Sequence, residues 1–114
     1  MATKDEVSRA IERLMARLDG NEANVRSAIP GRKVMGCRVL DLDMAWYSVI
    51  DDGHVSPPTQ TPPQDEPVAV LLNVNSDDLI ELVEERMSFM SAFLSGKVRV
   101  DASFIDLLRL RTLF

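Results

Sequence analysis

The sequence predicts a single α+β domain over residues 1–114, and three observations lead to this prediction. The chain has 114 residues, close to the commonest size of one domain. Its composition, 46% hydrophobic and 27% charged, is ordinary for a globular protein with one core. Segments with helical spacing of apolar residues stand at both ends, and strand-like segments lie between them, an order typical of α+β proteins.

The first predicted helix begins after Thr3. Thr3 and Glu6 have the spacing of a capping box, in which each residue satisfies a backbone N–H group of the other. Apolar residues then recur at helical spacing, at Val7, Ile11, Leu14, Met15 and Leu18. Gly20 predicts the end of this helix, and a shorter helical segment is expected over 23–29.

The middle of the chain predicts three strands. Alternation of apolar and other residues over 33–40 favours a half-buried strand, and a second strand is expected over 44–50. Asp52-Gly53 predicts a tight hairpin turn, because these residues tolerate the positive φ angles that such turns need. A short third strand is therefore expected over 54–56.

Residues 57–67 contain five of the six prolines. Proline lacks a backbone N–H and cannot complete a strand ladder, so this segment predicts an extended, poorly ordered surface loop. The loop is expected to interrupt one sheet and not to separate two domains.

The second half predicts a strand, a pair of helical segments, another strand and a last helix. Residues 68–74 are nearly all apolar, which favours a strand covered on both faces. Ser76 is expected to cap the next helix. A further helical segment is predicted over 88–95 and an alternating strand over 97–101, after which Ser103 is expected to cap the last helix.

Charge and cysteine content exclude several classes of protein. The net charge is -5 and no dense Lys/Arg cluster appears, so no nucleic-acid partner is expected. The N-terminus is polar and acidic, unlike a targeting peptide, and no apolar run reaches the length of a membrane span. The single cysteine, Cys37, cannot form an intrachain disulfide. These features predict a cytoplasmic protein without an integral membrane segment.

No residue pattern indicates catalysis. The only histidine, His54, stands beside a turn, and Cys37 lies within a strand without a recognisable partner base. One histidine and one cysteine cannot supply a zinc-ligand set. The sequence also lacks a phosphate-binding loop and a nucleophile elbow. We therefore expect no enzyme activity, no catalytic residue, no metal site and no cofactor.

The C-terminal segments carry more apolar residues than one buried face needs. The last helix is apolar around most of its circumference, at Phe104, Ile105, Leu107, Leu108, Leu110, Leu113 and Phe114. A packed core, a partner chain or a bound apolar ligand could each cover these side chains, and the residues alone leave the three open.

Two C-terminal segments are similar to the sterol carrier protein type-two (SCP-2) sterol-binding domain family: residues 75–82 (NSDDLIEL) and 91–100 (SAFLSGKVRV). Residues 44–53 (MAWYSVIDDG) resemble that family's strand and turn with a central aromatic residue. The likeness covers roughly residues 31–114, and its most specific part is the Ala-Phe…Gly-Lys block of the second segment. The proline-rich loop departs from the family pattern.

The resemblance implies a five-stranded mixed sheet covered by helices, with an apolar tunnel for a lipid or sterol-like small molecule. It implies non-catalytic binding, and transfer, of fatty acyl chains or sterols. The expected lining comprises the large apolar side chains on segments that the family places around its ligand: Trp46, Leu82, Met87, Met90, Phe93, Phe104, Leu107 and Leu108. The alternative is a protein-interaction or dimerisation module that uses the apolar C-terminal helix, and a homodimer stays open.

Overall fold

The computed structural model describes residues 2–110. Along the chain its elements are α1 (Lys4–Asp19), α2 (Glu22–Ala28), β1 (Arg32–Val39), the short 3-10 helix η1 (Leu40–Leu42), β2 (Met44–Asp51), β3 (His54–Val55), β4 (Val68–Val74), α3 (Ser76–Val83), α4 (Phe89–Leu94), β5 (Val98–Ala102) and α5 (Phe104–Leu110). Residues Leu113 and Phe114, predicted as part of the last helix, lie outside the described residues.

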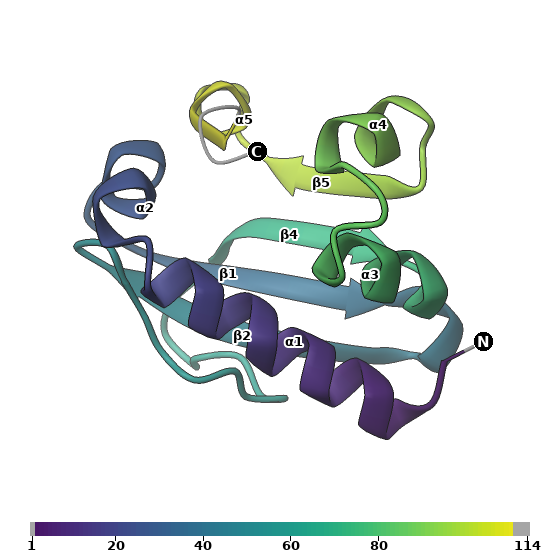
Figure 1. The fold of residues 1–114 in the computed structure, drawn as a ribbon. Coiled ribbons are helices and arrows are strands. Elements are labelled where there is room, and N and C mark those ends of the chain that lie inside the picture. Colours follow the sequence, from purple (N-terminus) through teal and green to yellow (C-terminus); the bar gives the residue numbers. More distant parts are fainter. Residues whose placement is uncertain (1, 111–114) are drawn as a thin grey trace.

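The strands form one five-stranded mixed sheet in the order β3-β2-β1-β4-β5. The central strand β1 runs parallel to β4 and antiparallel to β2, while the pairs β2–β3 and β4–β5 are antiparallel. Figure 1 shows α1 and α3 lying across one face of this sheet. The α+β fold with a five-stranded mixed sheet and covering helices is confirmed.

Helix α1 begins with the capping box that the sequence predicts. The Thr3 hydroxyl accepts a hydrogen bond from the Glu6 N–H, and the Glu6 carboxylate accepts one from the Thr3 N–H, both at 3.1 Å. The apolar stripe of the helix faces the sheet, and Val7, Ile11 and Met15 are buried in the core. Gly20 caps the C-terminus of α1, as predicted.

The β2–β3 hairpin also follows the prediction. Asp51 pairs with His54, so the turn consists of Asp52 and Gly53, whose φ angles are 50° and 87°. Two consecutive positive φ angles are the mark of the tight turn whose twist matches that of the flanking strands.

The proline-rich loop 57–67 lies between β3 and β4 of one sheet, as predicted. Thr59 exchanges two backbone hydrogen bonds with Tyr47 of β2, at 2.7 and 2.9 Å. Glu66, near the other end of the loop, accepts hydrogen bonds from Arg32 at 2.8 and 3.0 Å. These two contacts anchor the loop to β2 and β1. The proline content of the loop does not reveal them.

The predicted role of Ser76 as the N-cap of α3 is wrong. Asn75 occupies the cap position, and Ser76 is the first helical residue and fully buried. Asp41 of η1 accepts hydrogen bonds from the Ser76 N–H at 2.8 Å and from the Ser76 hydroxyl at 2.6 Å. A carboxylate remote in sequence thus satisfies the helix end, which local spacing could not indicate.

Strand β4 was predicted to be covered on both faces, but one of its faces is only partly covered. Val70, Leu72 and Val74 are buried towards the helices, whereas Ala69 and Leu71 on the opposite face are partly exposed. The reason is that the helices pack on the sheet face to which Val70, Leu72 and Val74 belong.

The last strand and helix agree with the predicted alternation and cap. Val98 is buried and Val100 packs against the core, while Lys97, Arg99 and Asp101 are exposed. The Ser103 hydroxyl accepts a hydrogen bond from the Asp106 N–H at 3.1 Å, which caps α5. Lys33 of β1 donates to the Asp106 carboxylate at 2.6 Å, and this ion pair ties α5 to the sheet.

Candidate functional site

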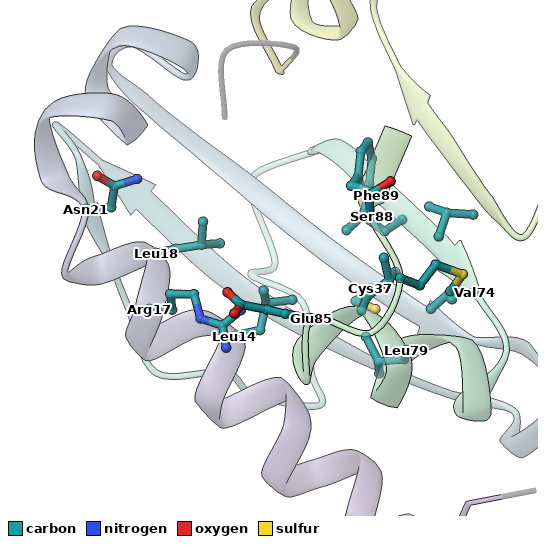
Figure 2. A pocket seen from close by; sticks show the side chains of 14 residues that line it. Leu14, Arg17, Leu18, Asn21, Cys37, Val74, Leu79, Glu85, Ser88 and Phe89 are labelled. Atoms are coloured by element: carbon teal, nitrogen blue, oxygen red, sulfur yellow. The ribbon is translucent and has the colours of Figure 1, made fainter. Parts of the chain in front are cut away.

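A pocket of about 430 Å³ lies between the helix-covered face of the sheet, α1 and the segment that joins α3 to α4 (Figure 2). Its walls come from several elements: Leu14, Arg17, Leu18 and Asn21 from α1 and the residues after it, Cys37, Leu72, Val74 and Val98 from the strands, and Leu79, Leu82, Glu85, Met87, Ser88 and Phe89 from α3, the joining segment and α4.

The floor of the pocket is made by alternate residues of three neighbouring strands. Leu72 of β4 is in register with Cys37 of β1, and Val74 is in register with Val98 of β5. Side chains two residues apart on a strand share a face, so these four groups point towards the helices. Burial raises the pKa of the Cys37 thiol to about 12. The thiol is therefore neutral, and Cys37 contributes an apolar surface and no nucleophile.

The rim of the pocket is polar. Arg17 of α1 donates a hydrogen bond to the Val83 carbonyl at 2.8 Å, and a guanidinium nitrogen lies 3.7 Å from the Glu85 carboxylate. Figure 2 shows the Arg17 and Glu85 side chains meeting beside the apolar lining. Both side chains are substantially exposed, so their ion pair stabilises the fold by no more than about 1 kcal/mol.

Glu85 also has an unusual backbone conformation. Its φ angle is 62°, in the left-handed region that glycine usually occupies at a helix C-terminus. The next N–H, of Arg86, donates to the Glu81 carbonyl at 2.9 Å, which closes the last turn of α3. The chain then turns across the pocket, and Ser88 caps α4 by accepting a hydrogen bond from the Ser91 N–H at 3.1 Å. Met87, Ser88 and Phe89 thereby form one wall.

The structure brings two of the eight predicted lining residues, Leu82 and Met87, to this pocket. Trp46 is buried in the core, beside a much smaller space that Ile11, Met15 and Pro58 also line.

The other predicted residues lie on the two C-terminal helices. Met90 and Phe93 of α4 are each 40% exposed, and neither lines the pocket. On α5, Leu107 is partly buried and Leu108 is 47% exposed. Phe104 belongs to α5, but its side chain lies outside the described part. Contact of these residues with a ligand stays a prediction.

Sequence reasoning missed the contribution of α1 to the pocket. Leu14 and Leu18 belong to the apolar stripe that was recognised, so the signal for their burial was present. The sequence held no signal that they lie near Leu82 and Phe89, because that proximity depends on how α1 and α3 pack side by side. The Arg17–Glu85 contact joins residues 68 positions apart and has no local signal at all.

The described part of the chain contains no group of three or more His, Cys, Asp or Glu side chains that could hold a metal ion. None of its helices is long and apolar enough to cross a bilayer. His54 is exposed at the start of β3, directly after the β2–β3 turn, and its imidazole lies 3.5 Å from the Glu22 carboxylate.

Residues 11–114 match the family model described as the SCP-2 sterol transfer family. Among solved structures, the UbiJ-SCP2 ubiquinone synthesis protein is 18% identical, with a TM-score of 0.65 over 96% of this chain and 94% of that one. Sterol carrier protein 2 like 2 from Aedes aegypti is 17% identical, with a TM-score of 0.64 over 97% and 98% of the two chains. These likenesses concern the fold.

The same fold also forms one part of larger enzymes. A sec-alkylsulfatase from Pseudomonas sp. is 16% identical, with a TM-score of 0.59, and the match covers 82% of this chain but only 14% of the sulfatase. The chain therefore spans a small fraction of that protein. Among curated protein sequences, none matches the chain.

Proposed function

The chain belongs to the SCP-2 sterol transfer family, and from that premise we propose that it binds a lipid-like apolar ligand, a fatty acyl chain or a sterol, in the pocket beneath α1. The pocket itself carries the proposal: its volume of about 430 Å³ falls within the roughly 300 to 1,000 Å³ typical of small-molecule sites. A closely packed core leaves few spaces larger than a water molecule.

The division of the pocket into an apolar interior and a polar rim supports an amphipathic ligand. Leu14, Leu72 and Phe89 would cover its hydrocarbon part, and burial of that part would drive binding at roughly 25 cal/mol per Å². Its polar end would lie at the rim beside Arg17 and Glu85. Among the described residues the lining includes no histidine, and the Cys37 thiol is neutral, so we propose binding, with transfer of the ligand between membranes, and no catalysis.

The test is to fill the pocket and measure both binding and stability. Leu82→Trp adds a ring where the pocket has room, so we expect saturable binding of a fluorescent fatty acid to be lost. We expect the melting temperature to stay within a few degrees of wild type. A larger side chain costs roughly 1–3 kcal/mol of stability in a filled core, but an empty pocket can accept it without that strain. Leu94→Trp, at a position 77% exposed and outside the pocket, is the matched control and should bind normally.

Two results would contradict the proposal. One is a wild-type protein that binds neither acyl chains nor sterols and carries no lipid when its native mass is measured after purification from cells. The other is a Leu82→Trp variant that loses stability but keeps its affinity, which would mean that the ligand binds elsewhere.

A second candidate function is a dimerisation module that uses α5. The exposure of Ile105 (59%) and Leu108 (47%) on this helix favours it, because large apolar side chains grouped on a surface often mark an interface. Sedimentation equilibrium of wild type and Leu108→Asp distinguishes the two: only a dimer that dissociates on this substitution supports an α5 interface.

A further inference from the structure

Helix α4 exposes three large apolar side chains on one side. Met90 and Phe93 are each 40% exposed and Leu94 is 77% exposed. Their spacing of three and four residues places them next to one another on the helix surface. Single exposed apolar residues need no explanation, but a contiguous group marks a surface that meets something apolar.

This apolar group is continuous with the ligand pocket. Phe89 lines the pocket, and its ring stacks on that of Phe93 with centroids 6.3 Å apart and the ring planes within 15°. Phe93 in turn is partly exposed on the outer side of α4. The stacked pair therefore links the lining of the pocket to the apolar group on the surface of α4.

Basic side chains follow the apolar group directly. A surface hollow of about 360 Å³ at the start of β5 is lined by Lys97 and Arg99, with the half-exposed Leu40 at its edge. Within residues 2–110, no ion pair involves either cation. One carboxylate, Asp78, shares the hollow, so positive charge exceeds negative charge there.

The nearby Glu81 carboxylate attracts Lys97, but it is already paired with Arg86. Its carboxylate is held by Arg86 at 2.9 Å, and that hydrogen bond is the main reason that its pKa is lowered. The hollow thus places two cations next to the C-terminal end of α4 and its exposed apolar side chains. Cations beside apolar groups suit anionic lipids, whose phosphate groups and acyl chains meet at the bilayer interface.

We propose that α4 and the start of β5 form the surface by which this protein contacts a lipid bilayer. Met90, Phe93 and Leu94 enter the interface between headgroups and acyl chains, while Lys97 and Arg99 bind phosphate-bearing headgroups. Figure 1 shows α4 beside β5, which is the edge strand of the sheet. A bilayer that touches this edge meets α4 on one face of the sheet and the exposed Arg99 on the other. The chain as a whole has a net charge of -5, so a local excess of cations favours an orientation of this surface towards an anionic bilayer.

The inference rests on the proposed function for its purpose, the exchange of a ligand with a membrane, but vesicle binding can be measured without any ligand. The assay is co-sedimentation with vesicles of phosphatidylcholine, with and without phosphatidylglycerol. We expect wild type to bind the mixed vesicles more tightly. Leu94→Asp should weaken binding about tenfold, since it replaces an apolar side chain that enters the bilayer by a charge. Ile105→Asp makes the same change at an exposed apolar residue of α5 and should have no effect.

A second set of variants tests the contribution of the lipid headgroups to vesicle binding. Replacing Lys97 and Arg99 by glutamate should remove the preference for phosphatidylglycerol, whereas Arg13→Glu, on the exposed side of α1, should keep it. Wild type that ignores both kinds of vesicle would overturn the inference, as would equal losses in Leu94→Asp and Ile105→Asp. A wild-type dimer that Leu94→Asp dissociates would overturn it too, because the surface would then join two copies of the chain.

Equilibrium binding of a fluorescent fatty acid, without vesicles, separates this inference from the proposed function. Normal ligand binding by a protein that ignores vesicles overturns only the membrane surface. Vesicle binding with the expected pattern of variants supports the membrane surface even if no ligand enters the pocket, and in that case only the proposed function fails.

Discussion

At the scale of single residues, Gly53 meets two demands in the β2–β3 turn. Its φ angle is 87°, and a Cβ placed there would lie 2.6 Å from the backbone oxygen of Glu22. Gly53→Ala should therefore destabilise the fold by about 2–4 kcal/mol, the sum of left-handed strain and a clash with α2. Unfolding in urea measures this change.

Gly96 provides the matched control. Its φ angle is 81°, but a Cβ there would have no neighbour within 4 Å, so Gly96→Ala should cost only about 1–2 kcal/mol. Equal losses at the two glycines would show that the contact between the turn and α2 contributes nothing.

The Asp41 carboxylate couples the stability of the fold to pH. Burial alone would raise its pKa, but the hydrogen bonds from Ser76 outweigh burial and the pKa is lowered. A carboxyl group whose folded pKa lies below its unfolded pKa stabilises the fold above the unfolded pKa, and this stability is lost as pH falls through the folded pKa. We expect the free energy of unfolding to decrease below about pH 4, where unfolded aspartate begins to protonate.

The variant Asp41→Asn isolates this contribution. It should lower stability at pH 7 by about 1 kcal/mol and flatten the decrease in acid, because the amide cannot titrate. Asp65→Asn, in the exposed proline-rich loop, is the control and should retain the wild-type acid dependence. Urea titrations at several pH values would contradict the account if the two variants behaved alike.

At the scale of elements, alternation decides what β5 contributes. Val98 is 2% exposed and faces the helices, while Arg99 points to the opposite, exposed face. Val98→Asp would bury an unpaired charge and should cost several kcal/mol, whereas Arg99→Asp should change stability by no more than about 0.5 kcal/mol. Melting temperatures that fall equally in both variants would refute the register of this strand.

The helices and strands also show which contacts a local sequence pattern can predict. The capping box of Thr3 and Glu6, the Asp52-Gly53 turn and the Ser103 cap all form as predicted, because each joins residues at most three positions apart. Ser76 fails the same reasoning, since its partner Asp41 lies 35 positions away. Anchoring of the proline-rich loop by Tyr47 is likewise a contact between strand and loop that composition cannot indicate.

At the scale of the whole molecule, the packing of helices on one face of the sheet creates the pocket. Helix α1 contacts α3, and the segment after α3 turns at Glu85 so that Phe89 closes a third side. The space exists because these walls stand apart above Cys37 and Leu72. An enclosed tunnel reaching α5, and with it ligand contacts at Leu107 and Leu108, stays a prediction.

What the sequence determined by itself is the set of elements, their order and the apolar face of each, because backbone preference and side-chain periodicity act over a few residues. It also carried enough family pattern to predict the sheet and a lipid-like ligand. Only the tertiary structure decided which apolar residues fill the core and which line the pocket. Trp46 and Leu82 look alike as candidates in the sequence, yet Trp46 is buried in the core and Leu82 lines the pocket. The difference depends on the distance between packed layers, and no local pattern records that distance.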